Sequence, residues 1–309
     1  MSTYVEPGWV EHFAELWEKL GPETRDTIVG LLGESWSWDT KRVMDFGCGA
    51  GRTLKHFMAE AEQAEIWGVD IHGPSIELLR DTVCPPLHVM QSGYWPPLQL
   101  EGESFDLIWA ISVFTHLADS SIPWLLELHR LLRPGGAAIL TYMGSETSEL
   151  LAGEPWDEDR IGMNVLRRNH PVSDGGPMVL ISDWWMREHW GRAFDVLETV
   201  EAHNQTWALL RRRDVSLSVD DVARPGSDAR EYEAVCHNLV QVQRELEALQ
   251  RKSIDDLSAA EAAGGEALEA QRREHERQLA EQRRVYEHSL SWRLTKPLRR
   301  AAARARGLA

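Results

Sequence analysis

The residues with the clearest chemical meaning in this 309-residue sequence are an acid and three glycines that follow a short apolar run. Asp45 is the last residue but one of this run, residues 42–46, and Gly47, Gly49 and Gly51 follow it. Glycine allows a sharp turn and lets the backbone approach a ligand with no Cβ in between. A carboxylate this close to the turn repels a diphosphate and attracts a cation. The pattern therefore predicts a site for a ligand that carries positive charge.

A second acid, Asp70, follows the next predicted strand, residues 65–69. A carboxylate there accepts hydrogen bonds from both hydroxyls of a ribose, in a nicotinamide dinucleotide and in S-adenosylmethionine alike. A G-x-G-x-x-G turn would place a pyrophosphate on a helix N-terminus, whereas this turn is G-x-G-x-G with Asp45 in front. The ammonium and sulfonium of S-adenosylmethionine fit that charge better. The alternative is an ordinary tight turn, with Asp70 as a helix cap.

The scaffold for these residues is predicted by alternation of strand and helix. Strands are expected at residues 42–46, 65–69, 87–90, 105–110, 137–142, 194–200 and 206–212, and helices at 10–20, 23–32, 51–61, 74–82 and in a segment that ends at 132. Such alternation predicts an α/β fold with a doubly wound, mostly parallel, seven-stranded Rossmann-like sheet. Ligands of such sheets bind beyond the carboxyl ends of the strands, which is where Asp45 and Asp70 stand.

Four motifs in residues 40–212 together resemble the class I S-adenosylmethionine-dependent methyltransferases. They are residues 43–52 (VMDFGCGAGR), Asp70, residues 105–110 (FDLIWA) and residues 131–136 (LLRPGG). The resemblance implies that S-adenosylmethionine is the cofactor, that the first, second and fourth strands line its pocket, and that Ser92-Gly93 flank the adenine. The cofactor-binding residues expected on this basis are Asp45, Phe46, Gly47, Cys48, Gly49, Gly51, Arg52, Asp70, Ile71, Ser92, Gly93, Ala110, Ile111 and Ser112.

A narrower resemblance covers residues 112–117 (SVFTHL) and 124–132 (WLLELHRLL). They are similar to methyltransferases of bacterial surface-glycan and polysaccharide biosynthesis, which implies a sugar or glycan acceptor. Those proteins often carry Thr-x-His-Gly after the fifth strand, but here the sequence is Thr141-Tyr142-Met143-Gly144, without the histidine.

A hydroxyl acceptor needs a base near its proton, and His116 is the candidate because it follows the fourth strand and its ordinary pKa suits the task. The alternative for His116 is a helix cap or packing beneath a lid, and His170 and His203 are weaker candidates for the base. No spacing typical of metal ligands is present. Residues 143–181 are expected to form a lid. The tryptophans on this side, Trp95 among them, would suit a sugar ring or simply fill the core.

The last third of the chain has a different composition. Residues 214–229 are expected to be a linker after a methyltransferase domain at 1–213, and residues 230–290 a coiled-coil helix with an a/d seam at Val235, Leu239, Val242, Leu246 and Leu249. A homo-oligomer is expected, or else one helix that folds back on its own domain. The basic tail, 291–309, is expected to contact an anionic membrane surface, with a protein partner as the alternative.

The bulk properties narrow the possible functions. A formal charge of −16 argues against nucleic-acid binding, and three distant cysteines favour a reducing cytoplasm, with a place at the inner face of the membrane also open. The sequence leaves open a small-molecule O- or N-methyltransferase of another pathway, a non-catalytic scaffold that binds S-adenosylmethionine, and an NAD-dependent sugar enzyme.

Overall fold

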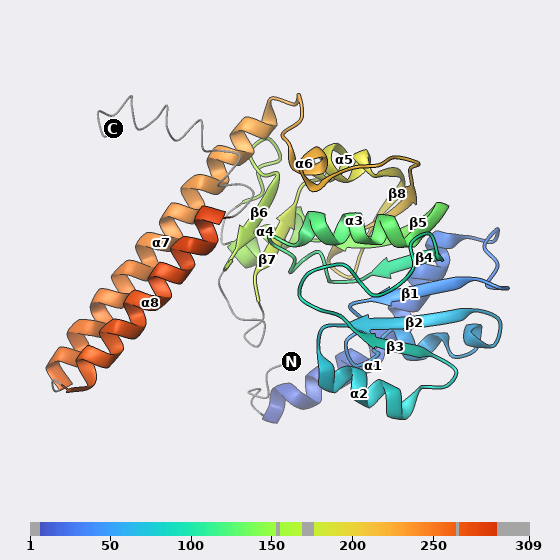
Figure 1. The fold of residues 1–309 in the computed structure, drawn as a ribbon, viewed down its shortest axis with the longest axis horizontal. Coiled ribbons are helices and arrows are strands. Elements are labelled where there is room, and N and C mark those ends of the chain that lie inside the picture. The colour runs from blue at the N-terminus through green and yellow to red at the C-terminus, as the bar shows by residue number, and fades with distance from the viewer. Residues whose placement is uncertain (1–6, 153–154, 169–175, 264–265, 289–309) are drawn as a thin grey trace.

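The centre of the molecule is a seven-stranded sheet with the strand order β3-β2-β1-β4-β5-β9-β8. The computed structural model describes residues 7–152, 155–168, 176–263 and 266–288. The strands of this sheet are β1 (Arg42–Phe46), β2 (Glu65–Asp70), β3 (His88–Gln91), β4 (Phe105–Ala110), β5 (Leu132–Tyr142), β8 (Phe194–Ala202) and β9 (Gln205–Arg212). Strands β1 to β5 pair in parallel, and β9 is antiparallel to both of its neighbours. The predicted Rossmann-like, mostly parallel sheet is confirmed (Figure 1).

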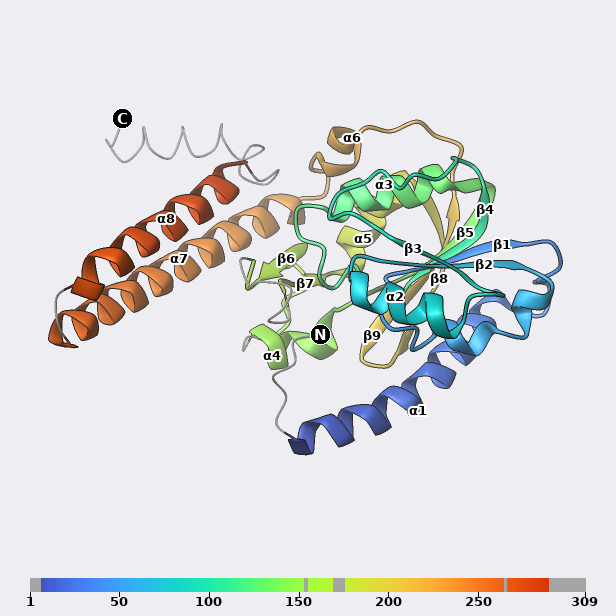
Figure 2. The same ribbon diagram turned by 60° about the horizontal axis from the view of Figure 1, so that its bottom comes forward.

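Some helices cover the two faces of this sheet, and others lie outside it. The helices of the described residues are α1 (Pro7–Leu32), α2 (Gly73–Thr82), α3 (Ser121–Leu131), α4 (Ser145–Ala152), α5 (Asp183–His189), α6 (Val219–Ala223), α7 (Arg230–Ala263) and α8 (Glu266–His288), with single turns η1 (Leu54–Phe57), η2 (Glu60–Glu62) and η4 (Trp190–Arg192). In Figures 1 and 2, α3, α5 and α6 lie on one side of the sheet, and α1 and α2 on the other.

The core forms two layers because successive strand residues point to opposite faces. Val43 packs in one layer with Ile28 of α1. The next residue, Met44, packs in the other layer with Leu125 of α3. A parallel sheet buried on both faces needs nearly continuous apolar strands, and β1 and β4 have that composition.

Two helix predictions in the first third were wrong in detail. The predicted break at residues 21–22 is absent, because α1 continues through Pro22 and buries Thr24 and Ile28 beyond it. The helix predicted at 51–61 is replaced by the short turns η1 and η2. In η1 the side chains of Leu54 and Phe57 are both buried, which suits a 3₁₀ turn since residues three apart eclipse each other in it.

The segment predicted as a lid has regular structure. It contains α4 and an antiparallel pair of strands, β6 (Met163–Leu166) and β7 (Met178–Ile181). This pair is tied to the end of β5, since the Ile181 amide donates to the Met143 carbonyl at 2.8 Å. We call residues 143–181 the insertion; its role as a lid stays a prediction.

The C-terminal third projects from the sheet domain as two helices rather than the predicted one. Helices α7 and α8 run side by side in both views and form what we call the helical arm (Figures 1 and 2). The predicted linker, residues 214–229, is partly helical because it contains α6. Ser218 caps this helix, and its side chain accepts from the Asp221 amide. Across the described helices we find no apolar span of the length that a bilayer requires.

Candidate functional site

The turn after β1 requires its glycines. Gly47, Gly49 and Gly51 all have positive φ angles, +82°, +54° and +82°, a region that other residues adopt only at a cost. A Cβ on Gly47 would clash with Val113, and one on Gly51 would lie 2.5 Å from the Leu79 side chain. These two glycines are therefore fixed by close packing as well as by backbone conformation.

Gly49 differs from the other two because it faces open space. A Cβ there would meet no described atom within 4 Å. Its amide donates to Oδ2 of Asp70 at 2.7 Å, and the His72 amide donates to Oδ1 at the same distance. The two backbone bonds fix the Asp70 carboxylate beside the turn. Each oxygen keeps a further lone pair that a ribose hydroxyl can use.

Asp45 is buried at 3% exposure at the end of β1. Burial raises the pKa of its carboxyl to about 7; the Trp109 indole lowers it, the Asp70 charge raises it and the Arg52 charge lowers it. Among the described residues, no donor lies in hydrogen-bonding geometry with Asp45 Oδ2. A buried carboxylate oxygen without a partner is unfavourable unless a ligand supplies a donor. An ammonium group is such a donor, so the residues present fit the expected cofactor.

The loop after β4 holds one strained residue. Ser112 has a φ of +60°. Its amide donates to Thr141 Oγ1 at 2.8 Å, and Gln205 Nε2 donates to its hydroxyl at 2.6 Å. Strain of this kind persists only where the surroundings hold it, and it is common at functional sites.

The remaining predicted cofactor residues lie around the same carboxyl edge of the sheet. Phe46 packs on Trp124, with ring centroids 4.7 Å apart, and the Ser92 amide donates to the Asp70 carbonyl at 2.9 Å. Cys48 is buried, and burial raises the pKa of its thiol. Ala110 is buried, while Ile71 is 41% exposed. The others of the set are Arg52, whose pKa burial lowers, exposed Gly93 and half-buried Ile111.

His116 is bound to the insertion. Its Nδ1 lies 2.9 Å from the Pro177 carbonyl oxygen. The neighbouring Thr115 carbonyl accepts from the Val179 amide at 2.8 Å. The ring itself is exposed. The loop after β4 and the strand β7 therefore form one wall, with His116 at its surface.

Within the described part of the chain, neither of the two weaker candidates for the base is seen to contact this wall. His203 occupies the β8–β9 turn, where Nε2 lies 3.2 Å from Thr27 Oγ1 of α1. His170 lies outside the described residues. The described ranges contain no cluster of three or more His, Cys, Asp or Glu side chains that could hold a metal ion.

The sequence from the middle of β1 to the middle of β5 matches a known family model. Residues 44–138 match the model described as "Methyltransferase domain". Over these residues the chain is similar to that family. The match confirms the predicted class, an S-adenosylmethionine-dependent methyltransferase, and the predicted cofactor. The match does not test the narrower resemblance to methyltransferases of surface-glycan biosynthesis.

Solved structures add distant similarities. The chain is similar to a SAM-dependent methyltransferase from Methanosarcina mazei at 13% identity, covering 60% of this chain and 97% of that one, with a TM-score of 0.45. For an S-adenosylmethionine-dependent methyltransferase from Mesorhizobium loti the values are 16%, 56%, 92% and 0.46. For a magnesium protoporphyrin IX methyltransferase from Synechocystis with bound SAM they are 15%, 62%, 79% and 0.42. These low similarities add nothing to the domain match. A search of curated proteins gives no match.

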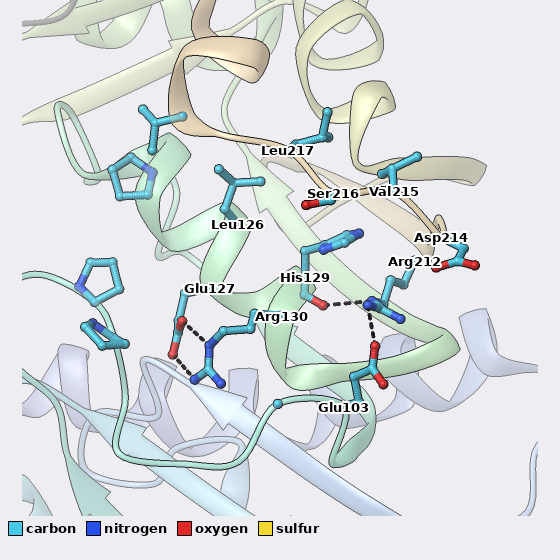
Figure 3. Close-up of a pocket in the computed structure, with 15 residues that line it drawn as sticks. Glu103, Leu126, Glu127, His129, Arg130, Arg212, Asp214, Val215, Ser216 and Leu217 are labelled. Carbon is cyan, nitrogen blue, oxygen red and sulfur yellow. Dashed lines mark hydrogen bonds and ion pairs between the residues drawn. The ribbon is translucent and has the colours of Figure 1, made fainter.

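A separate cavity of about 700 Å³ lies on the α3 side of the methyltransferase domain (Figure 3). It is at the opposite edge of the sheet, because Glu103 precedes β4 and Arg212 ends the antiparallel β9. Two ion pairs line it, Glu127–Arg130 and Arg212–Glu103, at 2.7 and 2.8 Å. None of the predicted site residues lines this cavity. Its charged groups join the 96–103 segment to the domain.

Sequence reasoning missed the groups that hold the site residues of the methyltransferase domain in place. Gln205 and Thr141 position Ser112, and Pro177 orients His116 through a backbone carbonyl. Thr141 stood in a quoted motif, so it had a signal. A carbonyl partner has no signature in sequence, because every residue has one.

Proposed function

We propose that the chain O-methylates a sugar or glycan intermediate, with His116 as the base. S-adenosylmethionine supplies an activated methyl group when bound. The observation that carries the proposal is the 2.9 Å contact between His116 Nδ1 and the Pro177 carbonyl oxygen.

This contact assigns the proton on the imidazole. A carbonyl oxygen only accepts hydrogen bonds, so Nδ1 carries a hydrogen and donates it. In the neutral ring the lone pair then resides on Nε2, and no described group bonds to that atom. Nε2 can therefore take the proton of an acceptor hydroxyl. The carbonyl also orients the ring, as second partners of catalytic histidines do.

Two carboxylates and the open space at Gly49 support the proposed cofactor site. Asp45 would face the ammonium of the cofactor, since its buried Oδ2 lacks a described partner. Asp70 would accept from the ribose hydroxyls, and Gly49 leaves room for close approach. The other residues of the predicted set would line the pocket, with Ser92 and Gly93 beside the adenine.

The test compares His116→Gln and His116→Ala with the wild type. Glutamine can still donate to the Pro177 carbonyl but cannot take a proton. We expect both variants to lose about 10²–10⁴-fold in kcat, with unchanged affinity for S-adenosylhomocysteine. Transfer of a labelled methyl group to sugar nucleotides and lipid-linked sugars is the measurement. Wild-type turnover by the glutamine variant would exclude His116 as the base.

We also propose that copies of the chain associate through the helical arm. The seam residues Val235, Leu239, Val242, Leu246 and Leu249 are only half-buried, and Val240 and Ile254 are 49% and 61% exposed. Changing Val240 and Ile254 to Glu should leave the monomer folded and reduce the molar mass measured by light scattering. A wild type that is already monomeric would contradict the proposal.

We further propose a cytoplasmic role in polysaccharide assembly, with the basic tail at the inner face of the membrane. The tail lies outside the described residues, and its charge supports the idea: Arg293, Lys296, Arg299, Arg300, Arg304 and Arg306. Each cation near an anionic surface contributes about 1 kcal/mol. Co-sedimentation with phosphatidylglycerol vesicles should be lost when residues 291–309 are deleted. Equal binding without the tail would disprove the membrane role.

A further inference from the structure

A chain of contacts links two exposed aromatic residues to the end of β1, where the cofactor turn begins. Phe46 of that turn packs on Trp124 of α3. The Trp124 indole donates to the Tyr94 carbonyl at 3.1 Å. Tyr94 and its neighbour Trp95 meet edge to face, 5.5 Å apart, and are 51% and 52% exposed. Two exposed aromatic side chains in mutual contact form a small apolar surface that a ligand can cover.

A partly buried ion pair joins the His116 loop to the insertion. Arg168, which follows β6, donates from Nη1 to Oδ1 of Asp119 at 2.5 Å. The Arg168 side chain is 10% exposed and that of Asp119 is 29% exposed. Asp119 is three residues beyond His116, so the ion pair and the proposed base belong to the same loop after β4.

The ion pair and the aromatic residues belong to one site. Burial raises the pKa of the Tyr94 phenol; the Asp119 charge raises it further and the Arg168 charge lowers it. The geometric link runs through Trp124, whose indole donates to the Tyr94 carbonyl and whose amide donates to the Ser120 carbonyl at 2.9 Å. Ser120 directly follows Asp119, so the Tyr94 backbone is held at the end of α3 that Asp119 precedes.

The charge balance of this site favours a neutral ligand. Asp119 and Arg168 compensate each other, so an anionic ligand would have to displace Asp119 from a largely buried partner, which is costly. Asp119 retains a partly exposed carboxylate that can accept from hydroxyls. Aromatic faces beside such a carboxylate suit the C–H face of a sugar ring.

We infer that Tyr94, Trp95, Asp119 and Arg168 form the subsite that recognises the methyl acceptor, and that its ligand is a neutral, polyhydroxylated ring. This inference rests on the proposed function and specifies its substrate class. Trp95 and Tyr94 pack against the ring, and Asp119 binds its hydroxyls. Arg168 is a positioning residue that orients Asp119.

The test measures binding without turnover. The full chain, saturated with S-adenosylhomocysteine, is titrated with methyl glycosides of glucose, galactose and mannose, and with the anionic methyl glucuronide, by saturation-transfer NMR. At least one neutral glycoside should bind more tightly than the glucuronide. Trp95→Ala should weaken that binding about tenfold, and Asp119→Asn should weaken it as well. Tyr232→Ala, which removes an exposed aromatic side chain of α7, should have no effect.

Each result bears on the subsite. Affinity for S-adenosylhomocysteine must be unchanged in every variant, and Trp95→Ala keeps the test valid if Asp119→Asn fails to fold. Preference for the glucuronide, binding of no glycoside, or full binding by Trp95→Ala would overturn the inference. Arg168→Lys should retain binding if the charge positions Asp119; loss equal to that of Asp119→Asn would show that the fork of Arg168 contacts the ring. Sugar methylation that is unaffected by these variants would overturn the subsite and leave the proposed function intact. Glycoside binding without methyl transfer to any sugar would contradict the proposed function alone.

Discussion

Asp45 favours binding of a cationic ligand but lowers the stability of the folded protein. Its carboxyl is buried, and burial raises its pKa to about 7 from a usual value near 3.8. A carboxyl whose pKa is raised by folding stabilises the native state least when it is ionised. Stability from this group is therefore full below pH 4 and is lost as the pH rises toward 7. We explain the presence of a destabilising carboxylate at position 45 by the cationic ligand that it would bind.

Replacing Asp45 with Asn should separate the two effects. A shift of this size corresponds to a few kcal/mol at most, so we expect the variant to melt several degrees higher at pH 8. It should also lose affinity for S-adenosylhomocysteine, which retains the ammonium. Differential scanning fluorimetry and calorimetry measure the two quantities. A lower melting temperature at pH 8, with binding retained, would contradict this account.

The same group predicts how binding depends on pH. Below pH 7 the free protein holds Asp45 mainly protonated, and the ammonium must expel that proton. Affinity for S-adenosylhomocysteine should therefore fall as the pH drops from 8 to 6, with proton release on binding. Titration in buffers of different ionisation enthalpy measures the release. The Asp45→Asn variant is the control, and its residual binding should be independent of pH over this range.

At the scale of elements, the crossing of the 96–103 segment over α3 depends on one buried acid. Glu127 is 5% exposed. It accepts from the Leu98 amide at 2.8 Å and from Arg130 at 2.7 and 2.8 Å. This side chain joins the segment that follows Tyr94 and Trp95 to the helix α3.

Two substitutions should distinguish its roles. Glu127→Gln keeps an acceptor for the Leu98 amide and should cost about 1 kcal/mol, whereas Glu127→Leu leaves that amide unpaired and should cost about 2–3 kcal/mol. Urea unfolding followed by tryptophan fluorescence gives both values. If the two variants are equally stable, the backbone bond to Leu98 contributes nothing.

The sheet was predictable from sequence because each buried strand is short, apolar and bounded by glycine, proline or acids. Strands β1 and β4 were placed at their observed bounds. The turns η1 and η2 were not, since composition alone does not separate a 3₁₀ turn from an α-helix. Strands β6 and β7 were missed because four-residue strands carry little periodicity.

The site was predictable where backbone conformation limits residue choice, as it does at Gly47 and Gly51. It was not predictable where long-range contacts define it. Asp119 and Arg168 are 49 residues apart in the chain, and no local pattern connects them. The Pro177 carbonyl is likewise set by the fold of the insertion.

At the scale of the whole molecule, the helical arm is joined to the methyltransferase domain by a buried pair. His189 Nε2 lies 2.8 Å from Glu231 Oε1, with side chains 3% and 7% exposed. His189 Nδ1 lies 2.7 Å from the Val222 carbonyl oxygen. Because that oxygen only accepts, Nδ1 carries a hydrogen, and the Nε2–Oε1 contact must share a further proton. Trp185 stacks on the ring at 4.1 Å.

Separate and combined substitutions of this pair should reveal its coupling. His189→Leu or Glu231→Leu leaves a buried polar partner and should cost about 3–5 kcal/mol. The double variant should cost less than both single changes added together. In the single variants, the hydrogen-exchange rates of the backbone amides in residues 230–250 should rise before those in β4. Additive costs would show that the two side chains do not depend on each other.

The arm does not depend on that pair alone. Asn238 Nδ2 donates to the Met163 carbonyl at 2.7 Å, and Glu245 accepts from the Arg167 amide at 3.3 Å. Each of these bonds joins a residue before position 214 to one after position 216, and Asp214 and Ser216 are exposed. A protease that cuts there therefore breaks the polypeptide and none of the contacts. The two pieces would then co-purify as a noncovalent complex. Continuity of the chain and integrity of the fold are therefore separate properties in this protein, and a nicked preparation should still bind S-adenosylhomocysteine.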